Sequence, residues 1–251
     1  MKTLLWILLG TVVALPFYGQ ASADSLFRRG NRLYYEGKYA AAEQTYLKIP
    51  ESGYHSAQLY YNLGNAAFKQ NKLVDAVYYY EKALKLNPRF KAARRNLETA
   101  RRGFQYKTRE LPEVLYKKIW RNIVQWLPAE VWGFLSLALL YISLFVALVF
   151  MFSPHIKRRK AAFYVLPFTS LLWLFFLLAA YSAEKYNAKL YAIIFDKQTE
   201  LHAGPSLNTE IKGKAYAGQK VEILEENEYW AKIKMPDGQI YWVEKQSYRK
   251  L

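Results

Sequence analysis

Two runs of the sequence place an amide side chain between two aromatic side chains at helical spacing. The members of each set stand at positions i, i+4 and i+7, so each set lies on one face of a helix. The sets are Phe27, Asn31 and Tyr34, and, 34 residues later, Tyr61, Asn65 and Phe68. An amide can hydrogen-bond the main chain of a bound segment, while aromatic rings supply apolar contact. These residues therefore predict a surface that binds a peptide.

Residues suited to catalysis or metal binding are scarce. The chain has no cysteine, which excludes disulfides, thiolate zinc sites and cysteine nucleophiles. Its three histidines, His55, His155 and His202, are far apart and lack the spacing of metal ligands. The sequence has no nucleophile–base arrangement and no glycine-rich loop for phosphate. We expect neither enzymatic activity nor a cofactor.

A 34-residue period organises the N-terminal region. It relates three pairs of identical residues: Gly30 and Gly64, Ala42 and Ala76, and Tyr46 and Tyr80. A helix–turn–helix unit of this length is typical of the tetratricopeptide repeat family, which the chain resembles at these positions. We expect the small residues where helix backbones approach closely, because larger side chains would push the helices apart. Pro88 is expected to end the second repeat.

The resemblance implies an all-α solenoid over residues 24–103, with a concave groove built from the first helix of each pair. The two aromatic–amide sets would line this groove. Lys91 and Arg95 on the next helix would add positive charge at one end, which suits an acidic or C-terminal peptide. The alternative is that Asn31 and Asn65 merely follow the common sequence of the family.

The third helix of this region departs from the period. Glu98 stands where the next glycine would fall, so we expect a cap helix and not a third full repeat. Two repeats are few for a solenoid, which needs about three to be stable. The module is therefore expected to be stabilised by contact with a partner protein, with a second copy of the chain, or with the membrane.

The first 23 residues have the features of a secretory signal peptide. Lys2 precedes an apolar run from Leu4 to Leu15, and Ala21-Ser22-Ala23 supplies an A-x-A cleavage site. We expect cleavage after Ala23. An uncleaved membrane anchor is the alternative, although the run is shorter than the roughly 20 residues of a spanning helix.

Two longer apolar segments, residues 129–152 and 161–183, predict transmembrane helices. Their only charged residue is Glu130, at the edge of the first segment, which argues against a pump or an ion channel. The connector, residues 153–160, is basic, as expected of a cytoplasmic loop. Four basic residues also precede the first segment, so the signal peptide decides the orientation by exporting the N-terminal region. The prediction is a helical hairpin whose two flanking soluble parts both lie outside the cytoplasm.

The segment before the first transmembrane helix is strongly basic. Residues 85–121 hold twelve Lys and Arg against three Glu, a net charge of +9, while the whole chain carries +16. In the juxtamembrane segment, residues 104–128, we expect an amphipathic helix on the bilayer surface. Its membrane-surface residues would be Lys117, Lys118, Trp120, Arg121 and Trp126. A plain solvated face is the alternative, and nucleic acid is not an expected partner because an exported domain meets none.

The last part of the chain, residues 184–251, changes to short β-prone runs and turn signals such as Pro236-Asp237-Gly238. About five strands in so short a segment predict a small all-β barrel. The sequence resembles bacterial SH3 domains, except that Tyr241 stands where that family more often has glycine. The positions that carry the resemblance are Gly204-Pro205-Ser206, Gly218, Trp230 and Trp242. We expect the two tryptophans to pack in the core.

Together these segments predict a multidomain membrane protein with a solenoid, a membrane hairpin and an SH3-like barrel. The order resembles that of the BatE-type proteins of the Bat aerotolerance operons. This resemblance implies a non-enzymatic scaffold in the bacterial inner membrane, with both soluble domains in the periplasm. Its partners would be other membrane proteins of the same operon type. The alternative is a protein that uses the SH3-like domain to bind peptidoglycan or to sense the cell envelope.

Overall fold

The computed structural model describes residues 23–104 and 114–251. It consists of two compact units, one formed by Met1–Glu110 with Leu190–Leu251 and the other by Leu111–Lys189. Except for Ala23, the predicted signal peptide lies outside the described residues. Residues 105–113 of the predicted juxtamembrane segment lie outside them as well.

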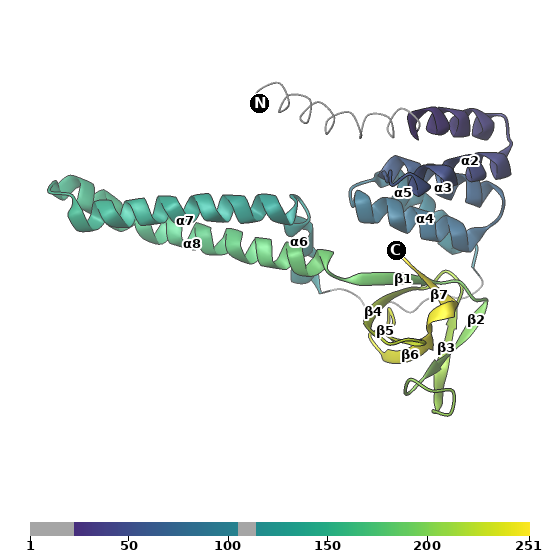
Figure 1. Ribbon diagram of the computed structural model, residues 1–251. Helices are drawn as coiled ribbons and strands as arrows, with labels where there is room; N and C mark the ends of the chain where they lie inside the picture. Colours follow the sequence, from purple (N-terminus) through teal and green to yellow (C-terminus); the bar gives the residue numbers. More distant parts are fainter. Residues whose placement is uncertain (1–22, 105–113) are drawn as a thin grey trace, which may run out of the picture. The chain divides into compact units, whose positions relative to one another are not determined.

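The N-terminal part of the first unit is a stack of antiparallel helices (Figure 1). The described part of its first helix covers residues 23–35. The helices that follow are α2 (Tyr39–Glu51), α3 (Ala57–Lys69), α4 (Leu73–Leu86) and α5 (Lys91–Arg102). The Ser56 hydroxyl caps α3 by accepting a hydrogen bond from the Leu59 amide at 3.1 Å. Helix α4 ends at Leu86, two residues before Pro88, as the proline predicts.

Apolar side chains on facing helices form the core of this stack. Leu59 and Leu63 of α3 and Val77 and Tyr80 of α4 are almost fully buried. Each such side chain contributes about 1.5–3 kcal/mol relative to an exposed one. The core continues into α5, where Leu97 is also buried. The helices are therefore held by packing along their common faces.

Gly30 and Gly64 have a different role from the one expected from the sequence. A Cβ atom at Gly64 would lie 2.5 Å from the ring of Tyr80, and one at Gly30 would lie 2.3 Å from the ring of Tyr46. Each glycine therefore makes room for the tyrosine ring of the facing helix. The expectation of a close approach between helix backbones is corrected, because the group that needs the space is an aromatic side chain.

The second unit contains α6 (Leu115–Val124), α7 (Ala129–Phe152) and α8 (Ile156–Asn187). Helix α8 begins inside the predicted connector and runs past the predicted end of the second apolar segment, so only Ser153–His155 separates α7 from α8. Both α7 and α8 are long and apolar enough to cross a membrane.

Helices α7 and α8 pack through small and hydroxyl side chains. Ser136 and Ser143 of α7 and Ala162, Thr169 and Ala179 of α8 are buried. Small residues let two helices approach closely where both are surrounded by lipid. The large apolar side chains of both helices are mostly exposed, as in helices that are surrounded by lipid. The chain thus has the features of a membrane-anchored protein.

Helix α6 packs on α8 through Trp120, which the sequence had assigned to the lipid headgroups. The Trp120 Nε1–H donates a hydrogen bond to Ser182 Oγ at 3.1 Å, and its ring meets the edge of Phe175 at 5.7 Å. Here the indole is partly buried and its N–H is bonded, as buried indoles generally require. Trp126, in contrast, is 64% exposed. Leu115 also remains exposed, so α6 keeps an apolar surface without Trp120.

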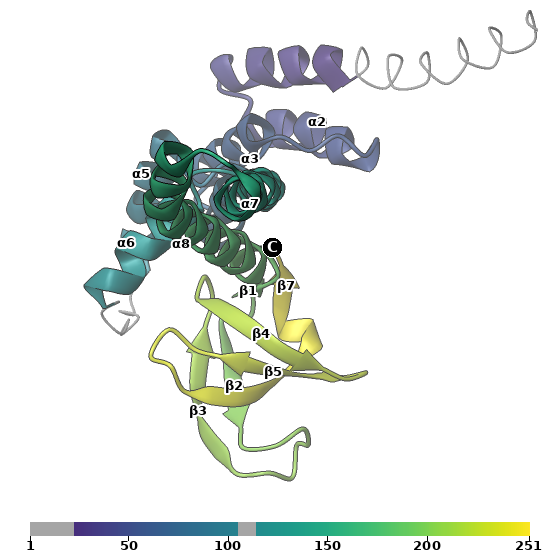
Figure 2. The same cartoon turned by 90° about the vertical axis from the view of Figure 1, so that its left-hand side faces the viewer.

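The C-terminal part of the first unit is an antiparallel sheet that curls on itself (Figures 1 and 2). Its seven strands are paired in the order β3-β2-β6-β5-β4-β1-β7. They are β1 (Leu190–Ile194), β2 (Gln198–His202), β3 (Ile211–Tyr216), β4 (Lys220–Glu226), β5 (Trp230–Lys234), β6 (Ile240–Glu244) and β7 (Tyr248–Lys250). The sequence predicts about five strands; the short β7 is among those that its pattern does not mark.

Alternate residues of the strands form the core of this domain. Val221, Ile233 and Val243 are buried on three neighbouring strands. Trp230 is buried as well, and its ring lies 5.1 Å from that of His202, edge to face. The expected core role of this tryptophan is therefore confirmed. Trp242 is only half-buried, and Lys232 Nζ lies 6.0 Å from its ring centre.

Candidate functional site

Two adjoining hollows form a groove along the first helices of the repeat stack. The larger, about 400 Å³, is lined mainly by helix 23–35 and α3. The smaller, about 170 Å³, is lined mainly by α3 and α5. They adjoin because Tyr34 and Asn65 line both. We call the two hollows together the amide groove.

The lining of the amide groove is polar and aromatic. The larger hollow is lined by Phe27, Asn31, Tyr34, Tyr35, Tyr46, Gln58, Tyr61, Asn62 and Asn65. The smaller hollow is lined by Tyr34, Asn65, Phe68, Lys69, Tyr80, Asn96 and Thr99. Among these lining residues, Lys69 alone carries a charge at neutral pH.

In the larger hollow, Asn31 is held by two hydrogen bonds to its carbonyl oxygen. The Tyr46 hydroxyl donates to Asn31 Oδ1 at 2.7 Å, and Asn62 Nδ2 donates to the same oxygen at 2.9 Å. Asn62 is fixed in turn, because its Oδ1 accepts a hydrogen bond from Gln58 Nε2 at 3.0 Å. The amide of Asn31 therefore has one fixed orientation.

The same arrangement recurs one repeat later. Asn65 Oδ1 accepts hydrogen bonds from the Tyr80 hydroxyl and from Asn96 Nδ2, both at 2.8 Å. Asn96 Nδ2 also lies 3.3 Å from the Tyr61 hydroxyl. The tyrosine ring that packs over each glycine thus belongs to the same tyrosine that orients the asparagine following that glycine. Tyr46 relates Gly30 to Asn31 in this way, and Tyr80 relates Gly64 to Asn65. Glycine, asparagine and tyrosine form one structural unit, which occurs twice.

These contacts decide what the groove offers to a ligand. The Oδ1 atoms of Asn31 and Asn65 are both satisfied internally, whereas the Nδ2 groups of these two residues donate to no described residue. A groove that presents free amide N–H groups selects acceptors, such as the carbonyls of an extended peptide or a carboxylate. The aromatic walls add apolar contact area.

The tyrosines that hold this arrangement do not titrate near neutral pH. Burial raises the pKa of Tyr46 to about 12. Burial also raises the pKa of Tyr80. Both hydroxyls therefore stay protonated and keep donating to the asparagines. The orientation of the amides is accordingly constant across the physiological pH range.

The structure brings together the two aromatic–amide sets predicted from the sequence, since all six residues line the amide groove. Lys91 and Arg95 line neither hollow and are exposed on α5. The positive charge at this end of the groove comes from Lys69 instead. The difference arises because Asn96 and Thr99 form the face that α5 presents to the smaller hollow.

Several lining residues were not singled out in the sequence, although the 34-residue period contains a signal for two of them. Asn96 follows Asn62 by 34 positions, and Thr99 follows Asn65 by 34. Extending the period into α5 would therefore have placed both residues on the groove. Gln58 lies outside the repeated positions, and no comparable signal marks it.

Replacing Asn65 by alanine is expected to destabilise the repeat stack, whatever it does to binding. The buried Tyr80 hydroxyl would lose its acceptor, and an unsatisfied buried hydroxyl costs about 1–3 kcal/mol. The full chain in detergent is unfolded in increasing concentrations of urea, and pulse proteolysis reports the fraction in which the repeat stack is still folded. The control is the same replacement in a Tyr80→Phe background, where the cost should be smaller. An equal cost in both backgrounds would show that the hydrogen bond contributes nothing.

Comparisons with known proteins give a family match for part of the repeat stack and for part of the C-terminal domain. Residues 57–90 match the tetratricopeptide repeat family, and residues 197–248 match the bacterial SH3 domain family. Comparison with curated proteins gives no match. Among solved structures, an NlpC/P60 family protein from Bacillus cereus ATCC 10987 is similar, with 19% identity and a TM-score of 0.22. That similarity covers 28% of this chain and 22% of the other, so this chain spans about a fifth of that protein.

The predicted fold class is confirmed by these findings. The chain combines a helical region that matches the tetratricopeptide repeat family, two long apolar helices and a C-terminal all-β domain that matches the bacterial SH3 family. Domains of these two families are in general protein-interaction or peptidoglycan-binding modules. The amide groove lies in the first of them.

Proposed function

We propose that the chain is a non-enzymatic, membrane-anchored scaffold whose amide groove captures an extended segment of a partner protein. The observation that carries the proposal is the pair of asparagine Nδ2 groups, of Asn31 and Asn65, that line the groove and have no acceptor among residues 23–104 and 114–251. Two donors fixed in orientation and flanked by aromatic rings suit a main chain that presents carbonyl groups in succession.

The charge near the groove favours an acidic or C-terminal segment as the ligand. Lys69 lines the smaller hollow and supplies the positive charge there. A carboxylate can accept hydrogen bonds from both an amide N–H and an ammonium group. The aromatic side chains supply the remaining contact area.

The cellular setting is proposed from the architecture and from the charges beside the membrane helices. The order of domains resembles that of BatE-type proteins, whose partners would be other membrane proteins of the same operon type. Lys157, Arg158, Arg159 and Lys160 form the first turns of α8, next to the hairpin turn. Four basic residues also precede α7 (Arg109, Lys117, Lys118 and Arg121), so the basic residues alone do not decide the orientation. The predicted signal peptide decides it, and we therefore place the turn in the cytoplasm and the soluble domains in the periplasm, at the inner membrane.

The test of the proposed function is a cross-linked pull-down from membranes, quantified by mass spectrometry. The variant is Tyr35→Ala with Lys69→Ala, because these exposed residues line one hollow each and their loss leaves the core intact. Loss of two such contacts is expected to reduce recovery of the groove ligand at least about ten-fold.

The matched control is Tyr54→Ala with Lys48→Ala, which removes the same side-chain types from exposed positions that line neither hollow. Recovery with this control should equal that of the unaltered chain. If the groove variant and the control recover the same proteins in the same amounts, the groove is not the capturing surface.

Binding of peptidoglycan by the SH3 domain is the alternative function. It is carried by the match of residues 197–248 to the bacterial SH3 family. The two functions separate in a sedimentation assay with purified cell wall and the full chain in detergent. Retention that is unchanged by Tyr35→Ala with Lys69→Ala would favour the alternative, whereas absence of retention would favour the scaffold.

A further inference from the structure

The outer side of α4 and α5 is in contact with the C-terminal domain, although the membrane hairpin separates these segments in the sequence. Both belong to the same compact unit. The contact has a buried polar centre, an apolar patch and an outer set of polar contacts. None of the residues described below as forming this contact lines the amide groove.

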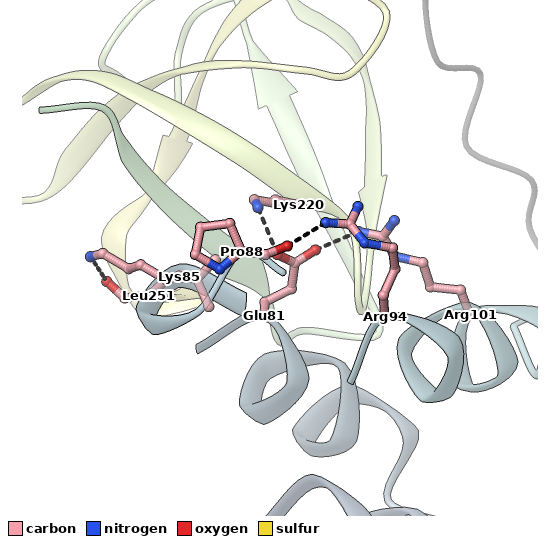
Figure 3. A network of polar contacts seen from close by, with 7 residues as sticks. All are labelled: Glu81, Lys85, Pro88, Arg94, Arg101, Lys220 and Leu251. Carbon is pink, nitrogen blue, oxygen red and sulfur yellow. Dashed lines mark hydrogen bonds and ion pairs between the residues drawn. The ribbon is translucent and has the colours of Figure 1, made fainter. Parts of the chain in front are cut away.

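The polar centre is Glu81 of α4, which is only 5% exposed. Figure 3 shows its carboxylate between two cationic groups: Arg101 Nη2 of α5 lies 2.8 Å from Oε1, and Lys220 Nζ of β4 lies 2.6 Å from Oε2. One of these partners comes from the repeats and the other from the C-terminal domain. A buried carboxylate is stable only when it is paired, so Glu81 depends on both sides of the contact.

The apolar patch surrounds strand β1. Ile193 is fully buried and is part of the same core cluster as the repeat helices, and Phe195 packs against that cluster. The rings of Phe195 and Tyr78 meet edge to face at 5.5 Å. Gly218, in the turn before β4, lies under the ring of Phe104, where a Cβ atom would be 2.5 Å from that ring. The fit is close enough that a side chain at this glycine would displace Phe104.

Polar contacts complete the surface near the end of the chain. Lys85 Nζ donates a hydrogen bond to the main-chain oxygen of Leu251 at 2.7 Å, as Figure 3 shows. The guanidinium of Arg249 lies 4.0 Å from the ring centre of Phe195 and 3.8 Å from Asp75 Oδ1. Such exposed pairs add little energy individually, but they fix the register of the contact.

The contact lies at the end of the repeat stack where a further repeat would be added. Helix α5 keeps the 34-residue phase at Asn96 and Leu97, but Glu98 replaces the glycine that would accommodate the tyrosine of a following helix. Glu81 lies on the side of α4 that faces α5, because Arg101 reaches it there. This is the direction in which a further helix pair would stack.

We propose that the C-terminal domain is the terminal cap of the repeat stack, so that the two soluble segments fold as one body. The cap takes the place of the third repeat that the stack lacks. The two segments flank α7 and α8, and side chains cannot meet across a hydrocarbon core of about 30 Å. Both segments therefore lie on the same face of the membrane. This inference does not depend on the groove.

The first experiment uses the fact that the chain contains no cysteine. Tyr78→Cys and Phe195→Cys are introduced together, and a protease site is inserted at Pro154, in the turn between α7 and α8. Membranes are treated with a short bismaleimide and then with the protease. The two halves are expected to migrate as one band on a denaturing gel. The control pair, Tyr35→Cys with Phe195→Cys, should separate into two, because Tyr35 lies at the far end of the stack and is 87% exposed.

The second experiment keeps the apolar patch and removes charges from the C-terminal domain. In the full chain, Lys220→Ala with Arg249→Ala should increase hydrogen exchange in α4 and α5 about ten-fold, since Glu81 loses one of its partners. The control is Lys214→Ala with Lys234→Ala, which removes the same net charge from exposed positions of the same domain. Exchange with this control should not change.

The proposal is overturned if the cross-link at Tyr78 and Phe195 is no stronger than that of the control pair. It is equally overturned if hydrogen exchange in α4 and α5 is the same in Lys220→Ala with Arg249→Ala as in Lys214→Ala with Lys234→Ala. The residues changed to test the contact, Tyr78, Phe195, Lys220 and Arg249, line neither hollow of the amide groove, so failure of this proposal and failure of the groove proposal give different results.

Discussion

Replacing Gly64 by leucine is expected to unfold the repeat stack while the membrane hairpin stays inserted. A Cβ atom at this position would lie 2.5 Å from the ring of Tyr80, and the remaining atoms of leucine would lie deeper in the same space. Overpacking of a core costs about 1–3 kcal/mol in ordinary cases, and this site has no room to relax because Tyr80 is buried and hydrogen-bonded to Asn65. A stack of two helix pairs and the single helix α5 buries a small core, so a loss of this size is a large share of its stability.

The measurement is limited proteolysis of the full chain in membranes. The soluble unit should be digested at protease concentrations that leave the unaltered chain intact, while a fragment containing α7 and α8 stays in the membrane. The matched control is Gln44→Leu, which adds the same side chain at an exposed position of α2 in the same stack. Equal resistance of the Gly64 and Gln44 variants would show that the tyrosine ring does not occupy this space.

A fluorescent reporter that matures only in the cytoplasm is expected to be bright in the turn between α7 and α8 and dark after Leu251. The predicted signal peptide exports the repeats, and the C-terminal domain contacts them, so the proposal places both domains outside the cytoplasm and the turn, Ser153–His155, inside it. The expected difference is close to all or none, because the reporter either reaches the cytoplasm or does not.

The control is the reciprocal reporter, an enzyme that is active only after export, fused at the same two positions. It should be active after Leu251 and inactive in the turn. Cytoplasmic fluorescence after Leu251 would contradict the periplasmic placement of the soluble domains.

The period of the sequence was sufficient to predict the helices, but the role of its glycines became clear only from the structure. Gly64 and Tyr80 are marked by the same 34-residue interval, which shows that both matter without showing that they touch. Their contact depends on how α3 and α4 cross. The same crossing brings the Tyr80 hydroxyl to Asn65, and it changes the interpretation of this asparagine from a ligand contact alone to a structural residue as well.

The contact between the repeats and the C-terminal domain could not be predicted from the sequence. Glu81 and Lys220 are 139 residues apart, and each resembles an ordinary charged residue of a solvated surface. The periodicity of a helix or strand shows which of its faces is polar, but it does not show which polar faces of different domains are in contact. The sequence did indicate that two repeats and one further helix need a stabilising contact with another surface. In the structure the C-terminal domain of the same chain provides such a surface.

Trp120 illustrates a similar limit. Its neighbours Lys117 and Arg121 and the membrane helix that follows make an interfacial position reasonable. The structure places the indole against Phe175 and Ser182 of α8, both of which lie within the predicted apolar segment 161–183. The contact depends on how α6 packs against α8, which hydropathy does not report.

The central claim, that the amide groove holds a segment of a partner protein, is tested most directly by site-specific photo-cross-linking in native membranes. A photoreactive amino acid is placed in turn at Tyr35 and Lys69, which line the groove, and at Tyr54 and Lys48, which do not. The account predicts that both groove positions yield adducts of the same partner, within one stretch of its sequence, and that the two control positions yield none. Adducts of equal yield at all four positions, or no adduct at either groove position, would contradict it.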